Sequence, residues 1–204
     1  MMNKTELINF FTSHCPDIEG VDEEEIDNFL VQFNLKLRPE HRNYLIKYGN
    51  STKLVKGWFA DCTFNNFKEH IFDLEEYIGD EIPKEGGVYF GHDFSDESLS
   101  IESASGNIYI YYNGDPDLLM YDNVDSFIFH CLFMNIFSDK KIERNVNIKI
   151  KNMEDFISEN KDYKIEGLGG YYYSYYLNAN MLIVVDHKEG YYSIYRGGIL
   201  DLLI

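Results

Sequence analysis

Apolar residues recur at helical spacing through the first third of the chain. Ile26, Phe29, Leu30 and Phe33 stand at i, i+3, i+4 and i+7, which predicts one helix with a single apolar stripe. Asp22 precedes this stripe as a capping residue, and Glu25 occupies the capping-box position. Further helices are expected at about 5–15, at 39–49 with Pro39 in its first turn, and at 65–78.

The period changes to two after residue 86. Strands are expected at 88–90, at 98–102 and at 108–112, with a turn at 105–107 and a loop over 113–117. A strongly apolar helix then runs to residue 137. A strand at 146–150, a short helix after Asn152 and three Tyr-rich strands near 170–177, 181–186 and 190–196 complete the pattern. This order predicts an α+β fold, in which a twisted antiparallel sheet of hairpins has helices packed on one face.

Charge suggests a division of the chain near residue 138. Residues 1–138 hold 9 Lys and Arg against 25 Asp and Glu, a net −16, whereas residues 139–204 hold 9 against 10, a net −1. We therefore expect an acidic α+β domain over 1–138. Residues 139–204 form a β-rich extension of one strand, one helix and three strands, which either continues the sheet or makes a half-domain beside it.

Two Gly-Gly pairs hint at an internal repeat. Gly86 precedes Leu99 by 13 residues, and Gly169 precedes Leu182 by the same spacing. A partial duplication and two ordinary hairpins of similar composition both account for the pattern.

The composition indicates a globular protein with a strong negative charge. The chain has 204 residues, of which 45% are hydrophobic, and a formal charge of −17. Such a charge disfavours nucleic acids and anionic membranes as partners and favours basic ones. Cys15, Cys62 and Cys131 form no C-x-x-C pair, and no apolar stretch follows the first residues. We expect a cytoplasmic protein without a signal peptide or disulfides.

Recognisable catalytic chemistry is missing from the sequence. It contains no nucleophile elbow, phosphate-binding loop, dinucleotide fingerprint or zinc-protease motif. The pairs Cys62–His70 and His92–Asp93 are the only suggestive neighbours for a nucleophile and its base. Zinc ligands normally come in close pairs, which the scattered His and Cys residues do not provide. We predict a protein that is not an enzyme and that has no cofactor and no metal.

Acidic clusters are the positive signal. They lie at 22–27, at 75–85, around the loop at 93–102, and at 115–125. Charge runs usually form a solvated face, but the last two clusters flank one predicted hairpin and include aromatic residues. We predict a partner-binding surface made of Asp93, Phe94, Asp96, Glu97, Glu102, Asp115, Asp117, Tyr121 and Asp122.

The order of these elements resembles the SUKH superfamily, which includes bacterial immunity proteins and fungal cell-wall-assembly regulators. The likeness covers about residues 22–137. It rests on Leu37-Arg38-Pro39-Glu40 leading to Tyr48-Gly49-Asn50, on Tyr89-Phe90-Gly91-His92-Asp93, on Gly106-Asn107-Ile108-Tyr109-Ile110-Tyr111, and on Ser126-Phe127-Ile128-Phe129. Arg38 is inserted between the Leu and Pro of the family pattern.

The resemblance implies binding rather than catalysis. Members are similar to antidotes that occlude a toxin encoded nearby, and many such toxins are nucleases with basic active sites. We therefore expect an immunity-type protein that neutralises a basic toxin domain, with Tyr109 and Tyr111 adding contact area. The alternative is a regulatory scaffold like the fungal relatives. A third interpretation is that the Tyr residues at 171–176 bind a sugar, although alternating Tyr more often stabilises a sheet.

Overall fold

The computed structural model describes residues 2–16, 18–54, 59–73, 86–93, 95, 97–112, 115–136 and 140–203. The chain forms two compact units. We call residues Cys15–Val124 the central unit, and residues Met1–His14 together with Asp125–Ile204 the terminal unit. Each unit has helices and its own five-stranded antiparallel sheet, so the α+β prediction is confirmed.

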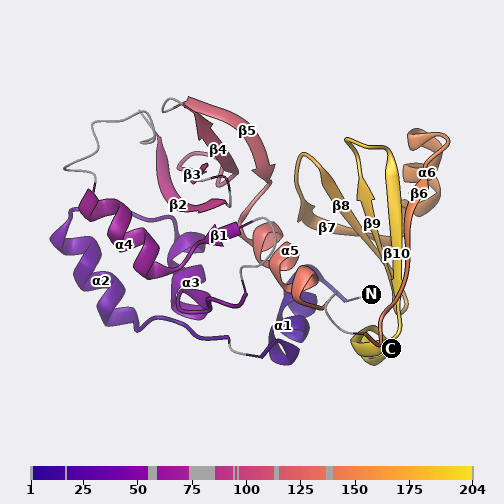
Figure 1. Cartoon of the computed structure of the whole chain (residues 1–204), viewed down its shortest axis with the longest axis horizontal. Helices are drawn as coiled ribbons and strands as arrows, with labels where there is room; N and C mark the ends of the chain where they lie inside the picture. The colour runs from indigo at the N-terminus through magenta and orange to yellow at the C-terminus, as the bar shows by residue number, and fades with distance from the viewer. Residues whose placement is uncertain are drawn as a thin grey trace. The chain divides into compact units, whose positions relative to one another are not determined.

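The described residues of the central unit form three helices and sheet A (Figure 1). Sheet A has the order β1-β2-β3-β4-β5, in which each strand pairs with the next along the chain. The elements are α2 (Glu23–Gln32), α3 (Pro39–Tyr48), β1 (Phe59–Asp61), α4 (Phe64–Asp73), β2 (Gly87–Asp93), β3 (Ser98–Glu102), β4 (Ile108–Tyr112) and β5 (Asp115–Tyr121).

Helix α2 begins and ends with local hydrogen bonds. The side chain of Asp22 accepts from the backbone N–H of Glu24, as its capping position predicted. Glu25 does not close the expected box; its carboxylate accepts from Lys68 Nζ at 2.9 Å. At the other end Asn34 has a φ of 51°, and the N–H of Leu35 donates to the carbonyl of Leu30. This Schellman turn folds the chain back beside the last turn of the helix.

Helix α3 lies against the core of the central unit. Pro39 occupies its first turn and Gly49 its C-terminal cap, as predicted. A Cβ at Gly49 would lie 2.5 Å from the carbonyl oxygen of Leu45, so close packing, rather than a left-handed backbone, requires glycine there. His41 is only 1% exposed, and its ring lies between those of Phe67 and Phe90.

Sheet A differs in two respects from the predicted hairpin. Leu99 and Ile101 are buried, but Ser98 and Ser100 on the other side of β3 are buried as well, so both sides of this strand are covered. Residues 115–117, predicted to be part of a loop, begin β5. Pro116 is tolerated there because β5 is an edge strand of the sheet.

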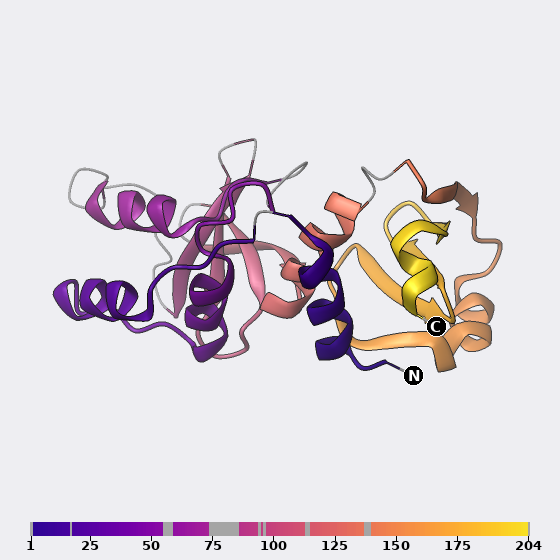
Figure 2. The ribbon, with the colours of Figure 1, turned by 90° about the horizontal axis from the view of Figure 1, so that it is seen from below.

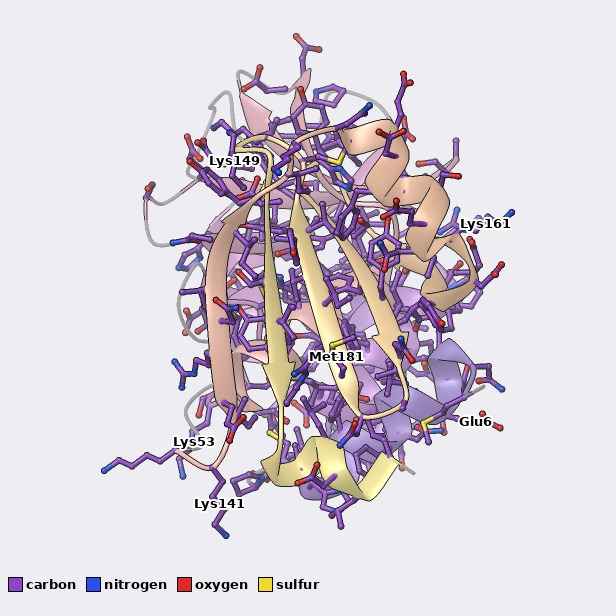
Figure 3. The ribbon with its side chains drawn as sticks, turned by 90° about the vertical axis from the view of Figure 1, so that its right-hand side faces the viewer. Glu6, Lys53, Lys141, Lys149, Lys161 and Met181 are labelled. Atoms are coloured by element: carbon purple, nitrogen blue, oxygen red, sulfur yellow. The ribbon has the colours of Figure 1, made fainter. Side chains whose placement is uncertain are left out.

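The terminal unit is built around sheet B, which has the order β6-β10-β9-β8-β7 (Figure 3). The strands after residue 139 thus form a second sheet and do not extend the first. The elements are α1 (Lys4–His14), α5 (Val124–Ile136), β6 (Glu143–Lys149), α6 (Met153–Asn160), η1 (Lys161–Tyr163), β7 (Lys164–Gly169), β8 (Tyr173–Asn178), β9 (Met181–Asp186), β10 (Tyr191–Arg196) and η2 (Gly198–Leu203).

Helices cover both faces of sheet B. On one face Phe129 of α5 packs edge-on against Tyr175, with ring centroids 4.8 Å apart. On the other face Phe156 of α6 contacts Tyr176 and Tyr192. Helix α1 lies beside β7 (Figure 2). The contacts therefore group α1 and α5 with the C-terminal sheet, whereas the charge pattern had placed both helices in the N-terminal domain.

The hairpin turns behind the suspected repeat share one geometry. Gly106 has a φ of 82° and its N–H donates to the carbonyl of Glu102. Gly190 has a φ of 69° and its N–H donates to the carbonyl of Asp186, at the same four-residue separation. The two turns are equivalent, while a duplication of the chain stays a prediction.

Candidate partner-binding surface

Of the residues predicted to bind a partner, those that the structure describes lie at two opposite ends of sheet A. The register pairs His92 with Ser98 and Tyr112 with Asp115 at one end, which we call the loop end. It pairs Gly87 with Glu102 at the other, which we call the turn end. The four residue steps from Ser98 to Glu102 correspond to about 13 Å along β3.

The predicted set divides between these ends. Asp93 ends β2 at the loop end, where Glu97, Asp115 and Asp117 are exposed. Glu102, Tyr121 and Asp122 lie at the turn end. Phe94 and Asp96 fall outside the described residues. The predicted partner-binding surface is therefore divided into two acidic groups, and the loop-end group is the larger of the two.

Arg38, for which the sequence predicted no contact, holds the turn end in place. Arg38 Nη1 donates to the carbonyls of Ser103 at 2.6 Å and Ala104 at 3.3 Å, although 65 and 66 residues separate them in sequence. Ser105 Oγ donates to the carboxylate of Glu102 in the same turn. Arg38, the residue before α3, thus holds the β3–β4 turn.

Two of the predicted aromatic contact residues are buried. Tyr121 is 4% exposed and Tyr111 is 6% exposed, because both lie in the covered part of sheet A. Tyr109 is half-buried. The expectation that Tyr121 and Tyr111 supply contact area is wrong. Tyr175 and Tyr176 are likewise buried, which removes two residues from the sugar-binding interpretation.

Part of the acidic cluster on α2 is neutralised within the central unit. Arg42 of α3 binds both carboxylate oxygens of Asp27, at 2.9 and 2.8 Å, and Glu23 at 2.7 Å. The pKa of Arg42 is raised by its hydrogen bonds to Glu23 and Asp27. Lys68 binds Glu25. Glu24 points to solvent. The acidic cluster predicted at 75–85 lies outside the described residues.

Nearly all of the net charge belongs to the central unit. It holds 8 Lys and Arg against 23 Asp and Glu, a net −15, and the terminal unit holds 10 against 12, a net −2. From residue 85 to residue 139 the sequence contains no Lys or Arg. Strands β2 to β5 of sheet A all fall within this range, so they bring carboxylates to both ends of the sheet and no cationic side chain.

A groove lined by both apolar and polar side chains lies at the C-terminal end of α2. It has a volume of about 450 Å³ and is lined by Asp27, Leu30, Val31, Asn34, Leu35 and Lys36. Val31 is 82% exposed. Periodicity does not predict this groove, because Val31 lies outside the apolar stripe of α2. The turn that brings Leu35 back toward the helix depends on the positive φ of Asn34.

A polar cluster joins α4 to β2 close to the loop end. Tyr89 donates to Asn66 Oδ1 at 2.8 Å, and His92 Nδ1 lies 3.2 Å from both Asn66 Nδ2 and the Tyr89 hydroxyl. The ring of His70 stacks on that of Tyr89, with centroids 3.6 Å apart. These contacts fix the end of β2 that leads into Asp93.

Cys62, His70 and His92, which the sequence suggested as nucleophile or base, are engaged in packing or hydrogen bonding. Cys62 is fully buried, and a Cβ at Gly91 would lie 2.3 Å from its Sγ, which shows how closely β2 approaches it. Within the described residues, no three His, Cys, Asp or Glu side chains gather in a way that suits a metal ion. The helices of the described residues include none with the length and apolarity to cross a membrane.

Comparison with models of known protein families finds no match, and neither does comparison with curated proteins or with solved structures.

Proposed function

We propose that this protein is a non-catalytic, immunity-type protein that binds and neutralises a basic toxin domain, and that it acts in the cytoplasm of the producing cell. The observation that carries the proposal is the concentration of charge in the central unit, with a net −15 and no Lys or Arg in strands β2 to β5. The resemblance to the SUKH superfamily supports the same class of protein.

The mechanism is occlusion of a cationic active site. An enzyme that holds a polyanionic substrate needs a basic cleft, and an anionic protein surface competes for it. The summed field of the central unit accelerates encounter with such a cleft, and complementary charges set the orientation of docking. The exposed carboxylates Glu97, Asp115 and Asp117 at the loop end are suited to this contact, since Asp115 and Asp117 lie in β5 and Glu97 directly precedes β3.

Co-expression tests the proposal. The toxin domain encoded beside this gene is expected to arrest growth alone, to be harmless together with this protein, and to co-purify with it. Asp115→Asn combined with Asp117→Asn should weaken protection. Glu159→Gln combined with Glu189→Gln, which removes two exposed charges from the terminal unit, should leave protection intact. Full toxicity in the presence of the wild-type protein, or the absence of any complex, would contradict the proposal.

A further inference from the structure

The groove at the end of α2 combines an exposed apolar surface with a fixed shape. Leu30 and Leu35 are held side by side by the Schellman turn, in which the Leu35 N–H donates to the Leu30 carbonyl at 2.9 Å. Val31, the neighbour of Leu30, turns outward and is 82% exposed. The groove therefore presents apolar carbon to solvent at a site whose backbone is locked by hydrogen bonds.

The outer face of α2 leads from carboxylates to this groove. Glu24 precedes Val31 by seven residues, which places both on one face about 10 Å apart along the helix axis. Asp27 lies between them and lines the groove. Glu19, Asp22 and Glu24 are exposed. From residue 18 to residue 35 the chain has six Asp and Glu and no Lys or Arg.

This charge determines the kind of occupant. Arg42 and Lys68 offset part of the six negative charges, and Lys36, which lines the groove, offsets one more. The remaining field is negative, so a segment that carries Lys or Arg is attracted and an acidic one is repelled. Interfaces of this kind place an apolar anchor at the centre and charged residues at the rim.

We infer that the groove at the end of α2 receives an apolar side chain of the cationic partner, while Glu24 on the same helix face binds a Lys or Arg of that partner. The inference rests on the proposed function and adds a second contact region to the loop end of sheet A. It assigns different tasks to the two parts: the groove slows dissociation, and the carboxylate speeds association.

Matched valine variants test the groove. Val31→Ser should accelerate dissociation of the toxin domain encoded beside this gene, used as a catalytically inactive protein, by about five- to tenfold, the effect of losing a buried Val side chain. Val146→Ser is the control, because Val146 is 50% exposed on β6 of the terminal unit. Thermal unfolding of both variants should match the wild type, since neither side chain is part of a core.

Glutamate variants test the charge on the same helix. Glu24→Gln should slow association at low salt with little change in dissociation, whereas Glu159→Gln on α6 should change neither rate. If the wild type binds the toxin domain but Val31→Ser dissociates no faster than Val146→Ser, the groove inference is overturned while the proposed function stands. If the wild type does not bind at all, both are overturned.

Discussion

Gly20 has no room for a side chain. A Cβ there would lie 1.7 Å from the carbonyl oxygen of Ile46, an atom of the α3 backbone that cannot move aside. Hydrogen bonds hold the segment on both sides of Gly20: the Asn50 N–H donates to the carbonyl of Glu19, and the Val21 N–H donates to the carbonyl of Leu45.

Gly20→Ala is therefore expected to destabilise the protein by about 2 kcal/mol or more, since the clash forces backbone movement. Gly86→Ala is the comparison. Apart from its chain neighbours, no atom of the described residues lies within 4 Å of a Cβ at Gly86, so its φ of 76° is the term that opposes the change, at a cost of about 1 kcal/mol. Urea unfolding of the two variants measures the difference. Equal stability of the two would show that the 18–21 segment is not packed on α3 as described.

His41 makes the stability of the central unit sensitive to acid. Burial lowers the pKa of His41 to about 3, because the charged ring would lose its water between Phe67 and Phe90. The unfolded chain takes up this proton near pH 6.5, so it binds more protons than the folded state below that pH. The contribution of neutral His41 is complete above about pH 6.5 and is lost as the pH falls toward 3, at up to about 1.4 kcal/mol per pH unit.

His41→Phe should remove this dependence, because an apolar ring takes up no proton. The free energy of unfolding should fall less between about pH 6.5 and about pH 4.5 in the variant than in the wild type. Chemical denaturation at several pH values gives both curves. Taking their difference cancels other titrating groups, including His130, whose pKa burial lowers to about 4. Parallel curves would show that His41 is not buried as a neutral group.

Among the helices, α2 depends on the residue that caps its N-terminus. Asp22 accepts a hydrogen bond from the Glu24 N–H at 2.8 Å and places a carboxylate at the helix N-terminus. Asp22→Ala should cost about 1 kcal/mol of stability, and Asp22→Asn, which keeps the acceptor oxygen, should cost less. Thermal unfolding of both variants separates the cap from the charge. An Ala variant as stable as the Asn variant would mean that the cap contributes nothing.

Features that depend on neighbouring residues, such as helix caps, could be predicted from the sequence. Asp22 and Asn152 at helix starts and Pro39 in a first turn all occupy the predicted places, because capping depends on neighbouring N–H groups. The apolar stripe of α2 likewise buries Ile26 and Phe29. Local chemistry fixed the existence and type of these elements.

Features set by long-range pairing were not readable. Strand β5 contains Pro116 and turn-forming residues, and only its pairing with β4 reveals it as a strand. The separation of Glu102 from Asp115 follows from the register of β3 and β4, which sequence spacing does not define. The contact of Arg38 with Ser103 joins residues 65 positions apart. For the candidate surface, the composition indicated that its charge is negative, and the fold determined where the charged residues lie.

Across the whole molecule, the net charge is distributed according to the two compact units. The central unit carries a net −15 and the terminal unit a net −2, although the terminal unit takes residues from both ends of the chain. A general need for solubility would not require such an uneven distribution. Long-range attraction of a cationic partner requires a coherent field, which charge concentrated in one compact unit provides.

The most direct test of the proposed attraction is the rate of association with the toxin domain that we propose is encoded beside this gene, measured by stopped flow as a function of salt. Screening shortens the reach of the field from above 10 Å toward a few Å between about 0.05 M and about 0.5 M salt. We expect the association rate constant to fall by about tenfold or more over that range, while the dissociation rate constant changes little. An association rate that does not vary with salt would contradict the claim that the acidic central unit attracts a cationic partner.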